Sequence, residues 1–67
     1  MNEAKDVEKR IFELLRRQPM SVSELARLLE LRRDFVSGYL EALRSKDKLE
    51  LIKVGRSNVY VPKEGSK

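Results

Sequence analysis

The residues of this chain that could do chemistry are basic and small polar side chains, most of them in its second half. Two adjacent arginines, Arg32 and Arg33, begin a stretch with helical periodicity, and a second polar group surrounds the dipeptide Gly55-Arg56. A guanidinium group can bind a phosphate, or donate two parallel hydrogen bonds to the acceptor edge of a guanine. These side-chain types therefore favour binding of a polyanion.

Catalysis and metal binding find little support in the composition. The 67 residues include no histidine and no cysteine, which removes the commonest general base and the preferred zinc ligands. A site made of carboxylates alone would need a deep pocket to shift their pKa values, and a domain of this size rarely encloses one. We therefore expect a protein that is not an enzyme, with no cofactor and no small-molecule ligand.

The basic charge is placed unevenly along the chain. Residues 1–31 carry six basic and six acidic side chains, whereas residues 32–67 carry nine basic and five acidic ones. The whole net charge of +4 therefore lies in the second half, beginning at the two arginines. Such a one-sided distribution favours a polyanionic partner.

The sequence also predicts where the protein acts. Its N-terminal stretch MNEAKDVEKR is charged throughout and does not have the form of a signal peptide. No apolar run approaches the roughly 20 residues that a membrane-spanning helix needs. We expect a cytoplasmic protein without membrane insertion. Its abundance of lysine, arginine and glutamate is a thermophile-like composition.

Two predicted helices, residues 4–17 and 22–29, come before the basic half of the chain. Ser21 and Glu24 have the S-x-x-E spacing of a capping box, in which each side chain bonds the other's backbone N–H. The second helix should therefore begin directly after Ser21. Apolar residues at helical spacing predict the buried faces. These residues are Ala4, Val7, Ile11, Leu14 and Leu15 in the first helix, and Leu25, Ala26 and Leu29 in the second.

A third predicted helix, residues 32–45, is followed by a β-hairpin. Val36, Leu40 and Leu43 share one face of this helix, so the two arginines begin a helix whose other side faces outward. Two β-rich runs, residues 49–54 and 58–61, flank Gly55-Arg56, and glycine at the first central position suits a two-residue type II′ turn. Proline 62 should end the second strand, and residues 63–67 should form a tail.

With this order of elements, the chain resembles the winged helix-turn-helix superfamily, in particular compact archaeal and bacterial regulators of MarR-like or ArsR-like type. The resemblance rests on SELARLLEL (23–31), VSGYLEAL (36–43) and GRSNVYVP (55–62), and covers about residues 5–62. It implies an α+β fold, with three helices and a C-terminal hairpin wing in a single domain, 1–67, ordered over about 4–62. It also implies a small transcriptional regulator that binds double-stranded DNA, with the third helix in the major groove and the wing on the backbone or the minor groove.

The resemblance implies that DNA contacts come from the outward side of the third helix and from the wing tip. Arg33 lies where a recognition helix first meets base edges, with Arg32 nearer the core, and Arg56 suits phosphate or minor-groove contact. The alternatives are a solvated basic turn at the arginines and ordinary turn chemistry at the hairpin. The expected DNA-binding residues are Arg32, Arg33, Ser37, Gly38, Arg44, Lys46, Lys48, Lys53, Arg56, Ser57 and Asn58.

Four of these residues have a further alternative. A glycine inside a helix costs about 1 kcal/mol relative to alanine. Gly38 is thus either a point of close approach by DNA or a partner, or an incidental small residue. Ser37 either bonds a phosphate or a base or is only solvated. Lys46 and Lys48 are either phosphate contacts or residues that only raise solubility.

The chain departs from the family pattern at two positions. Glu30 stands where a glycine is common between the paired helices, and a left-handed residue there would cost about 1 kcal/mol, so we expect a differently shaped turn. Arg32 stands where serine or threonine is common, so the third helix lacks its usual N-cap.

Acidic residues in the third helix support a second interpretation. Phosphates would repel Asp34 and Glu41 unless each carboxylate accepts a hydrogen bond from a cytosine amine. The alternative function is a winged-helix protein-interaction module in a replication, transcription or membrane-remodelling assembly. In the first helix, Phe12 lies outside the buried stripe. It could form a homodimer contact through that helix or cover the hairpin.

Overall fold

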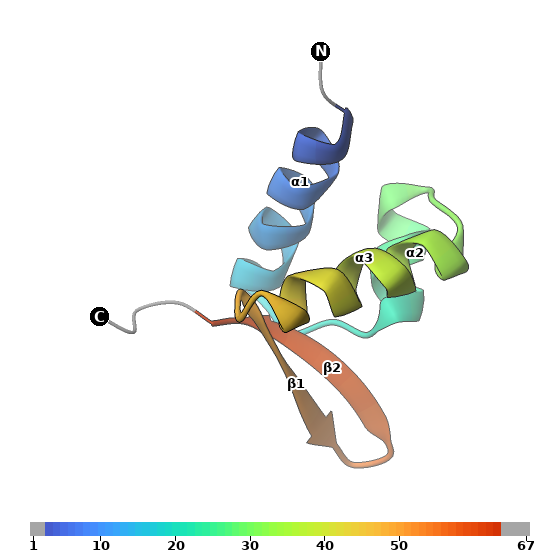
Figure 1. The fold of residues 1–67 in the computed structure, drawn as a ribbon. Helices are drawn as coiled ribbons and strands as arrows, with labels where there is room; N and C mark the ends of the chain where they lie inside the picture. Colours follow the sequence, from blue (N-terminus) through green and yellow to red (C-terminus); the bar gives the residue numbers. More distant parts are fainter. Residues whose placement is uncertain (1–2, 64–67) are drawn as a thin grey trace.

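Three helices and a β-hairpin follow one another along residues 3–63, the part of the chain that the computed structural model describes; side chains are described from residue 6 onward (Figure 1). Helices α1, α2 and α3 span Glu3–Arg17, Val22–Leu29 and Arg33–Ser45, and strands β1 and β2 span Leu49–Val54 and Ser57–Pro62. This is the predicted winged-helix fold, three helices followed by a hairpin wing.

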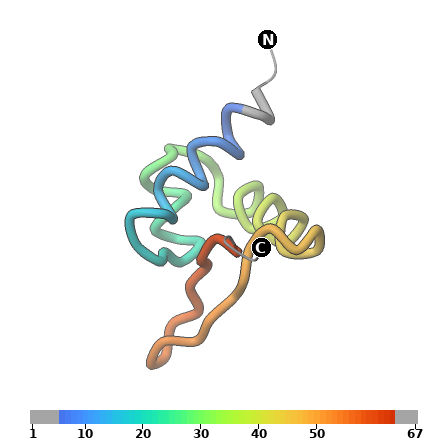
Figure 2. The backbone as a smooth tube through the Cα atoms, turned by 90° about the vertical axis from the view of Figure 1, so that its left-hand side faces the viewer, coloured from blue at the N-terminus to red at the C-terminus, as the bar shows by residue number. Residues whose placement is uncertain are grey.

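The core lies where the three helices meet the base of the hairpin (Figures 1 and 2). It confirms every predicted core position except three: Val7 and Leu14 are only half-buried, and the side chain of Ala4 lies outside the described residues. Leu49 and Tyr60 bring the hairpin into the core. A single aromatic residue in a strand, such as Tyr60, is expected to be structural, whereas the sequence did not predict the burial of Leu49. The buried residues are Ile11, Leu15, Met20, Leu25, Ala26, Leu29, Val36, Leu40, Leu43, Leu49 and Tyr60.

The turn between α2 and α3 is left-handed although its key residue is not glycine. Glu30 has φ 58° and ψ 44°, its N–H bonds the carbonyl of Arg27, and the N–H of Leu31 bonds the carbonyl of Ala26 at 3.0 Å. These two bonds make a Schellman motif, with Glu30 at the position that glycine usually takes. The expected different turn shape is wrong: two backbone hydrogen bonds and the half-buried Leu31 offset the strain of a left-handed glutamate.

Helix α3 begins one residue later than predicted. Arg32 is its N-cap, with extended backbone and no side-chain hydrogen bond to the helix, so the expected lack of a side-chain cap is confirmed. Arg32 is exposed rather than near the core, because it lies outside the helix and does not follow its periodicity.

The hairpin has a regular antiparallel register from Leu49 opposite Pro62 to Val54 opposite Ser57. Between the strands Gly55 has φ +61°, while Arg56 is not among the described residues with positive φ, as a type II′ turn requires. In both views the hairpin extends away from the helices (Figures 1 and 2).

The hairpin base is tied to the rest of the chain on both sides. Met20 pairs with Tyr60 as an isolated antiparallel bridge, so the connection between α1 and α2 runs beside β2. Lys63 was expected in the tail. Its N–H, however, bonds the carbonyl of Lys48 at 2.9 Å, and its ammonium contacts Asp47 at 2.7 Å. Lys63 is thus bound to the base of the hairpin, while residues 64–67 of the expected tail lie outside the described residues.

Candidate nucleic-acid interface

A polar groove of about 360 Å³ separates the start of α2 and the start of α3 from the hairpin. It brings together three of the predicted DNA-binding residues, Arg33 from α3 and Ser57 and Asn58 from β2, which are all exposed. The remaining lining residues are Ser21, Val22, Ser23, Leu51 and Tyr60. The groove therefore joins the predicted recognition helix to the predicted wing.

The start of α2 contributes a side of the groove that the sequence analysis missed. Both bonds of the predicted capping box are present: the Ser21 hydroxyl accepts from the Glu24 N–H at 3.2 Å, and Glu24 accepts from the Ser21 N–H at 3.0 Å. The first N–H groups of a helix have no intrahelical acceptor and carry partial positive charge. Val22 and Ser23, the first two residues of this helix, line the groove. The sequence signal for this side of the groove is the capping box, which marks the start of α2.

One flank of α3 runs beside the wing. Arg33, Ser37, Glu41 and Arg44 recur at helical spacing and therefore share this flank. Its two ends meet the wing differently: Arg33 lines the groove, and Glu41 accepts a hydrogen bond from the Tyr60 hydroxyl. Glu41 also pairs with Arg44, whose Nη2 lies 3.2 Å from Oε1.

These contacts define the charges on the flank. The hydrogen bond from Tyr60, and secondarily that from Arg44, lowers the pKa of the Glu41 carboxyl, so Glu41 is ionised at neutral pH. Burial, and secondarily the bond to Glu41, raises the pKa of Tyr60 to about 12, which keeps its hydroxyl a donor. The carboxylate that phosphates would repel is thus bound within the molecule by a phenol and a guanidinium.

Gly38 occupies an exposed position on α3, next to this flank. A Cβ added to Gly38 would lie more than 4 Å from every described atom other than those of its two chain neighbours and of the adjoining helix backbone. The φ of Gly38 is not positive. Neither packing nor backbone conformation inside the chain therefore requires a glycine here.

The wing tip presents the remaining predicted contacts of the hairpin. Lys53 and Arg56 are exposed, and Lys53 lies opposite Asn58 in the register. Opposite residues of an antiparallel pair point to the same face, so Lys53 shares the groove-facing side of the hairpin with Asn58.

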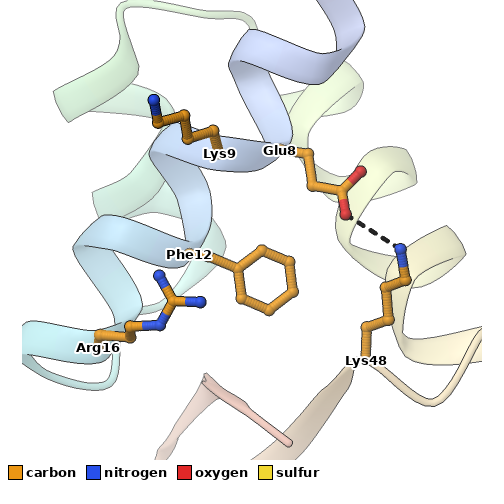
Figure 3. Close-up of a pocket in the computed structure, with 5 residues that line it drawn as sticks. All are labelled: Glu8, Lys9, Phe12, Arg16 and Lys48. Atoms are coloured by element: carbon orange, nitrogen blue, oxygen red, sulfur yellow. Dashed lines mark hydrogen bonds and ion pairs between the residues drawn. The ribbon is translucent and has the colours of Figure 1, made fainter. Parts of the chain in front are cut away.

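The predicted basic contacts that follow α3, Lys46 and Lys48, lie in a different place. The ammonium of Lys48 lies 3.1 Å from a Glu8 carboxylate oxygen, in a shallow pocket beside α1 rather than in the polar groove (Figure 3). Lys46 is the exposed C-cap of α3. The structure thus does not bring Lys48 together with Arg33 and the wing.

The shallow pocket beside α1 contains Phe12, the residue outside the predicted buried stripe. Its half-buried ring packs against the core, and the Arg16 guanidinium carbon lies 5.6 Å from the ring centroid. Glu8, Lys9 and Lys48 complete the lining, so a ring is surrounded by charges of both signs (Figure 3).

Two other kinds of site are not found among the described residues. No group of three or more acidic side chains there is arranged to hold a metal ion. No helix in residues 3–63 is both long enough and apolar enough to span a bilayer.

Comparison with known proteins places this geometry in a family. The family model of the bacterial regulatory proteins of the arsR family matches residues 9–54. The solved structure of HlyU from Vibrio cholerae N16961 superposes with a TM-score of 0.78 at 25% sequence identity, covering 88% of this chain. This chain spans 64% of the length of HlyU. No curated protein sequence matches. Because the family model covers more than half of the residues, the chain belongs to the ArsR family of bacterial regulatory proteins, a family of winged helix-turn-helix DNA-binding transcription regulators.

Proposed function

We propose that this domain binds double-stranded DNA for transcription regulation, with α3 in the major groove and the wing on the neighbouring backbone or minor groove. The observation that carries this proposal is the polar groove between Arg33 and the wing residues Ser57 and Asn58. A helix lying in the major groove has a phosphate strand beside it, and a wing on the same side must cross that strand. The groove provides a path for the strand.

The groups that line this path suit a phosphate. The Arg33 guanidinium, the Asn58 amide and the serine hydroxyls are donors, and the N-terminal end of α2 adds partial positive charge. The exposed part of α3 also has a suitable size, since a helix is about 10–12 Å across and the major groove is about 12 Å wide.

The proposal assigns different roles to the two arginines of this surface. Arg33, at the start of α3, reaches base edges at the floor of the major groove. Arg56, at the hairpin turn, meets the backbone or an A·T-rich minor groove. Gly38 fits the same arrangement, because its empty surroundings leave room for DNA close to the helix backbone.

A titration of the protein against a labelled random duplex at several salt concentrations tests the proposal. Each phosphate contact should contribute about 0.9 to the slope of log affinity against log salt. Arg10→Ala is a matched control, because it removes the same charge from an exposed position of α1. Absence of duplex binding by the wild type at moderate salt would contradict DNA binding and favour the protein-interaction module.

We also propose that the protein binds DNA as a homodimer through α1. The support is the position of Phe12 between Glu8 and Arg16, four residues before and after it, in the shallow pocket (Figure 3). If two α1 helices pack antiparallel with a two-fold axis at Phe12, Glu8 of one chain lies opposite the partner's Arg16. A dimer would double the footprint of one small domain and read two half-sites.

Sedimentation or light scattering at high micromolar concentration tests this dimer. Phe12→Ser should give a folded monomer, whereas Glu13→Ser, on the exposed side of α1, should leave the dimer intact. A monomeric wild type would contradict the dimer and leave DNA binding by a single domain.

A further inference from the structure

We propose that the hydrogen bond from Tyr60 to Glu41 is a positioning contact that fixes the orientation of the wing relative to α3. Tyr60 and Glu41 are positioning residues: their effect on DNA binding acts through the wing tip. The DNA readout of this inference rests on the proposed function, whereas its structural readout does not.

The wing can be oriented only at its base. Every residue from Glu50 to Asn58 is exposed, so the outer part of the hairpin makes little contact with the helices. The buried residues of the two strands are Leu49, 2% exposed, and Tyr60, 4% exposed. The angle of the wing therefore depends on contacts at the base, where these two residues are the most deeply buried.

Tyr60 makes three kinds of contact that converge on this base. Its backbone N–H and carbonyl pair with Met20 at 2.8 and 3.4 Å, its ring is buried in the core, and its hydroxyl donates to Glu41 of α3. The Met20 pairing ties β2 to the chain before α2, but it does not reach α3. The Glu41 bond is a polar link from β2 to the predicted recognition helix.

A small rotation at this base becomes a large displacement at the tip. Strands rise about 3.3 Å per residue, so Arg56 lies roughly 13 Å along the strand from Tyr60. A rotation of about 10° would then move Arg56 by roughly 2 Å. Because hydrogen bonds to oxygen lie within about 2.7–3.2 Å, such a shift would break a phosphate contact.

The same bond gives an exposed carboxylate of α3 a partner within the chain. Glu41 lies on the flank that includes Arg33, yet its oxygens accept from Tyr60 and from Arg44. The lowered pKa of Glu41 and the raised pKa of Tyr60 are consistent with an ionised acceptor and a neutral donor. Glu41 thus orients the wing while the neighbouring Arg44, also exposed, balances its charge.

Two substitutions of Glu41 separate positioning from simple repulsion. Glu41→Gln removes the charge but keeps an oxygen that can accept from Tyr60, whereas Glu41→Ala removes both. Tyr60→Phe removes only the donor and keeps the buried ring. If Glu41 merely repelled phosphates, Gln and Ala would have the same effect on DNA binding. If it positions the wing, Gln should behave like the wild type and Ala like Tyr60→Phe.

The structural readout is the orientation of the wing relative to α3, measured by residual dipolar couplings of the backbone amides without DNA. We expect wild-type couplings in Glu41→Gln, and altered or averaged couplings for residues 50–58 in Glu41→Ala and Tyr60→Phe. Circular dichroism first verifies that each variant is folded. Wild-type wing couplings in both Glu41→Ala and Tyr60→Phe would overturn the positioning role, whether or not the protein binds DNA.

The DNA readout is the contribution of the wing tip, measured as the loss of duplex affinity on Arg56→Ala in each background. This loss should be about tenfold in the wild type and in Glu41→Gln, as for one hydrogen bond to a charged group. It should fall to about twofold or less in Glu41→Ala and Tyr60→Phe. An equal loss in all four backgrounds would overturn the claim that this contact serves DNA binding. A wild type that binds no duplex refutes the proposed function instead, and the couplings still decide the positioning role.

Discussion

The Tyr60 hydroxyl donates a hydrogen bond to the Glu41 carboxylate, joining a buried residue of β2 to an exposed residue of α3, 19 positions apart in sequence. In the sequence alone, Glu41 was an argument against DNA binding, because phosphates repel a carboxylate in a groove. The structure gives that carboxylate two partners inside the chain, Tyr60 and Arg44. Its presence in α3 is therefore compatible with a phosphate strand nearby.

Stability at low pH should depend on Glu41. Its pKa is lowered in the folded state, so its contribution is present above the ordinary value of 4.5 and is lost as pH falls through the lowered value. The melting temperature of the wild type should fall between pH 7 and pH 3. In Glu41→Gln, which cannot ionise at this position, the fall should be smaller. Equal falls in the two proteins would show that the carboxylate bond does not stabilise the fold.

Arg33→Ala and Arg56→Ala should affect DNA binding in different ways. Loss of a base contact at Arg33 should reduce affinity for the preferred site by about 1–3 kcal/mol while non-specific affinity stays nearly unchanged. Loss of a backbone contact at Arg56 should weaken binding to every duplex and reduce the salt slope by about 0.9. Competition titrations with preferred and random duplexes at several salt concentrations measure both effects. If neither variant differs from Arg10→Ala, this face does not bind DNA.

Gly38→Ala should separate protein stability from DNA affinity. Because an added Cβ meets no described atom within 4 Å, alanine should stabilise the helix by about 1 kcal/mol. If DNA comes close to the helix backbone here, the same methyl group should reduce duplex affinity. Chemical denaturation and duplex titration measure the two effects separately. A more stable variant with unchanged affinity would identify Gly38 as an incidental small residue.

Glu30→Gly should stabilise the turn between α2 and α3. Glycine adopts the left-handed conformation of residue 30 without the strain of about 1 kcal/mol that an L-residue has there. The greater entropy of glycine in the unfolded state offsets part of this gain in stability. We expect a gain of up to about 1 kcal/mol in the free energy of unfolding, measured by chemical denaturation. Glu13→Gly is the matched control: at an exposed position inside α1 it should cost about 1 kcal/mol. Destabilisation by both would show that the Glu30 side chain itself supports the turn.

Leu40→Ala should destabilise the protein strongly. Leu40 is fully buried on the core face of α3, so truncation removes buried apolar area and leaves a cavity. The expected loss is about 2–5 kcal/mol. Ser45→Ala, an exposed residue of the same helix, should stay within about 0.5 kcal/mol of the wild type in the same denaturation experiment. A melting midpoint unchanged by Leu40→Ala would contradict the core face assigned to α3.

Local sequence patterns were enough to predict the order and approximate bounds of the helices and strands. The capping box at Ser21 and Glu24 and the turn glycine Gly55 act through neighbouring backbone, so they can be recognised without knowing the rest of the fold. The apolar positions of α3 repeat with the helical period, which predicted the burial of Val36, Leu40 and Leu43. The type of each predicted DNA-binding side chain, basic or small and polar, was also evident in the sequence.

Only the tertiary structure decided which of these side chains lie together. It brought Arg33 beside Ser57 and Asn58, and it placed Lys48 against Glu8 of α1 instead. Sequence spacing could not predict these contacts because they depend on how the hairpin packs on the helices. That packing rests on Leu49 and Tyr60. Their burial comes from contacts with residues far away in the sequence, and not from the alternation of apolar and polar residues along a strand alone. The left-handed Glu30 was missed for a related reason: local propensity opposes it, and the backbone bonds and packing of the folded turn outweigh that propensity.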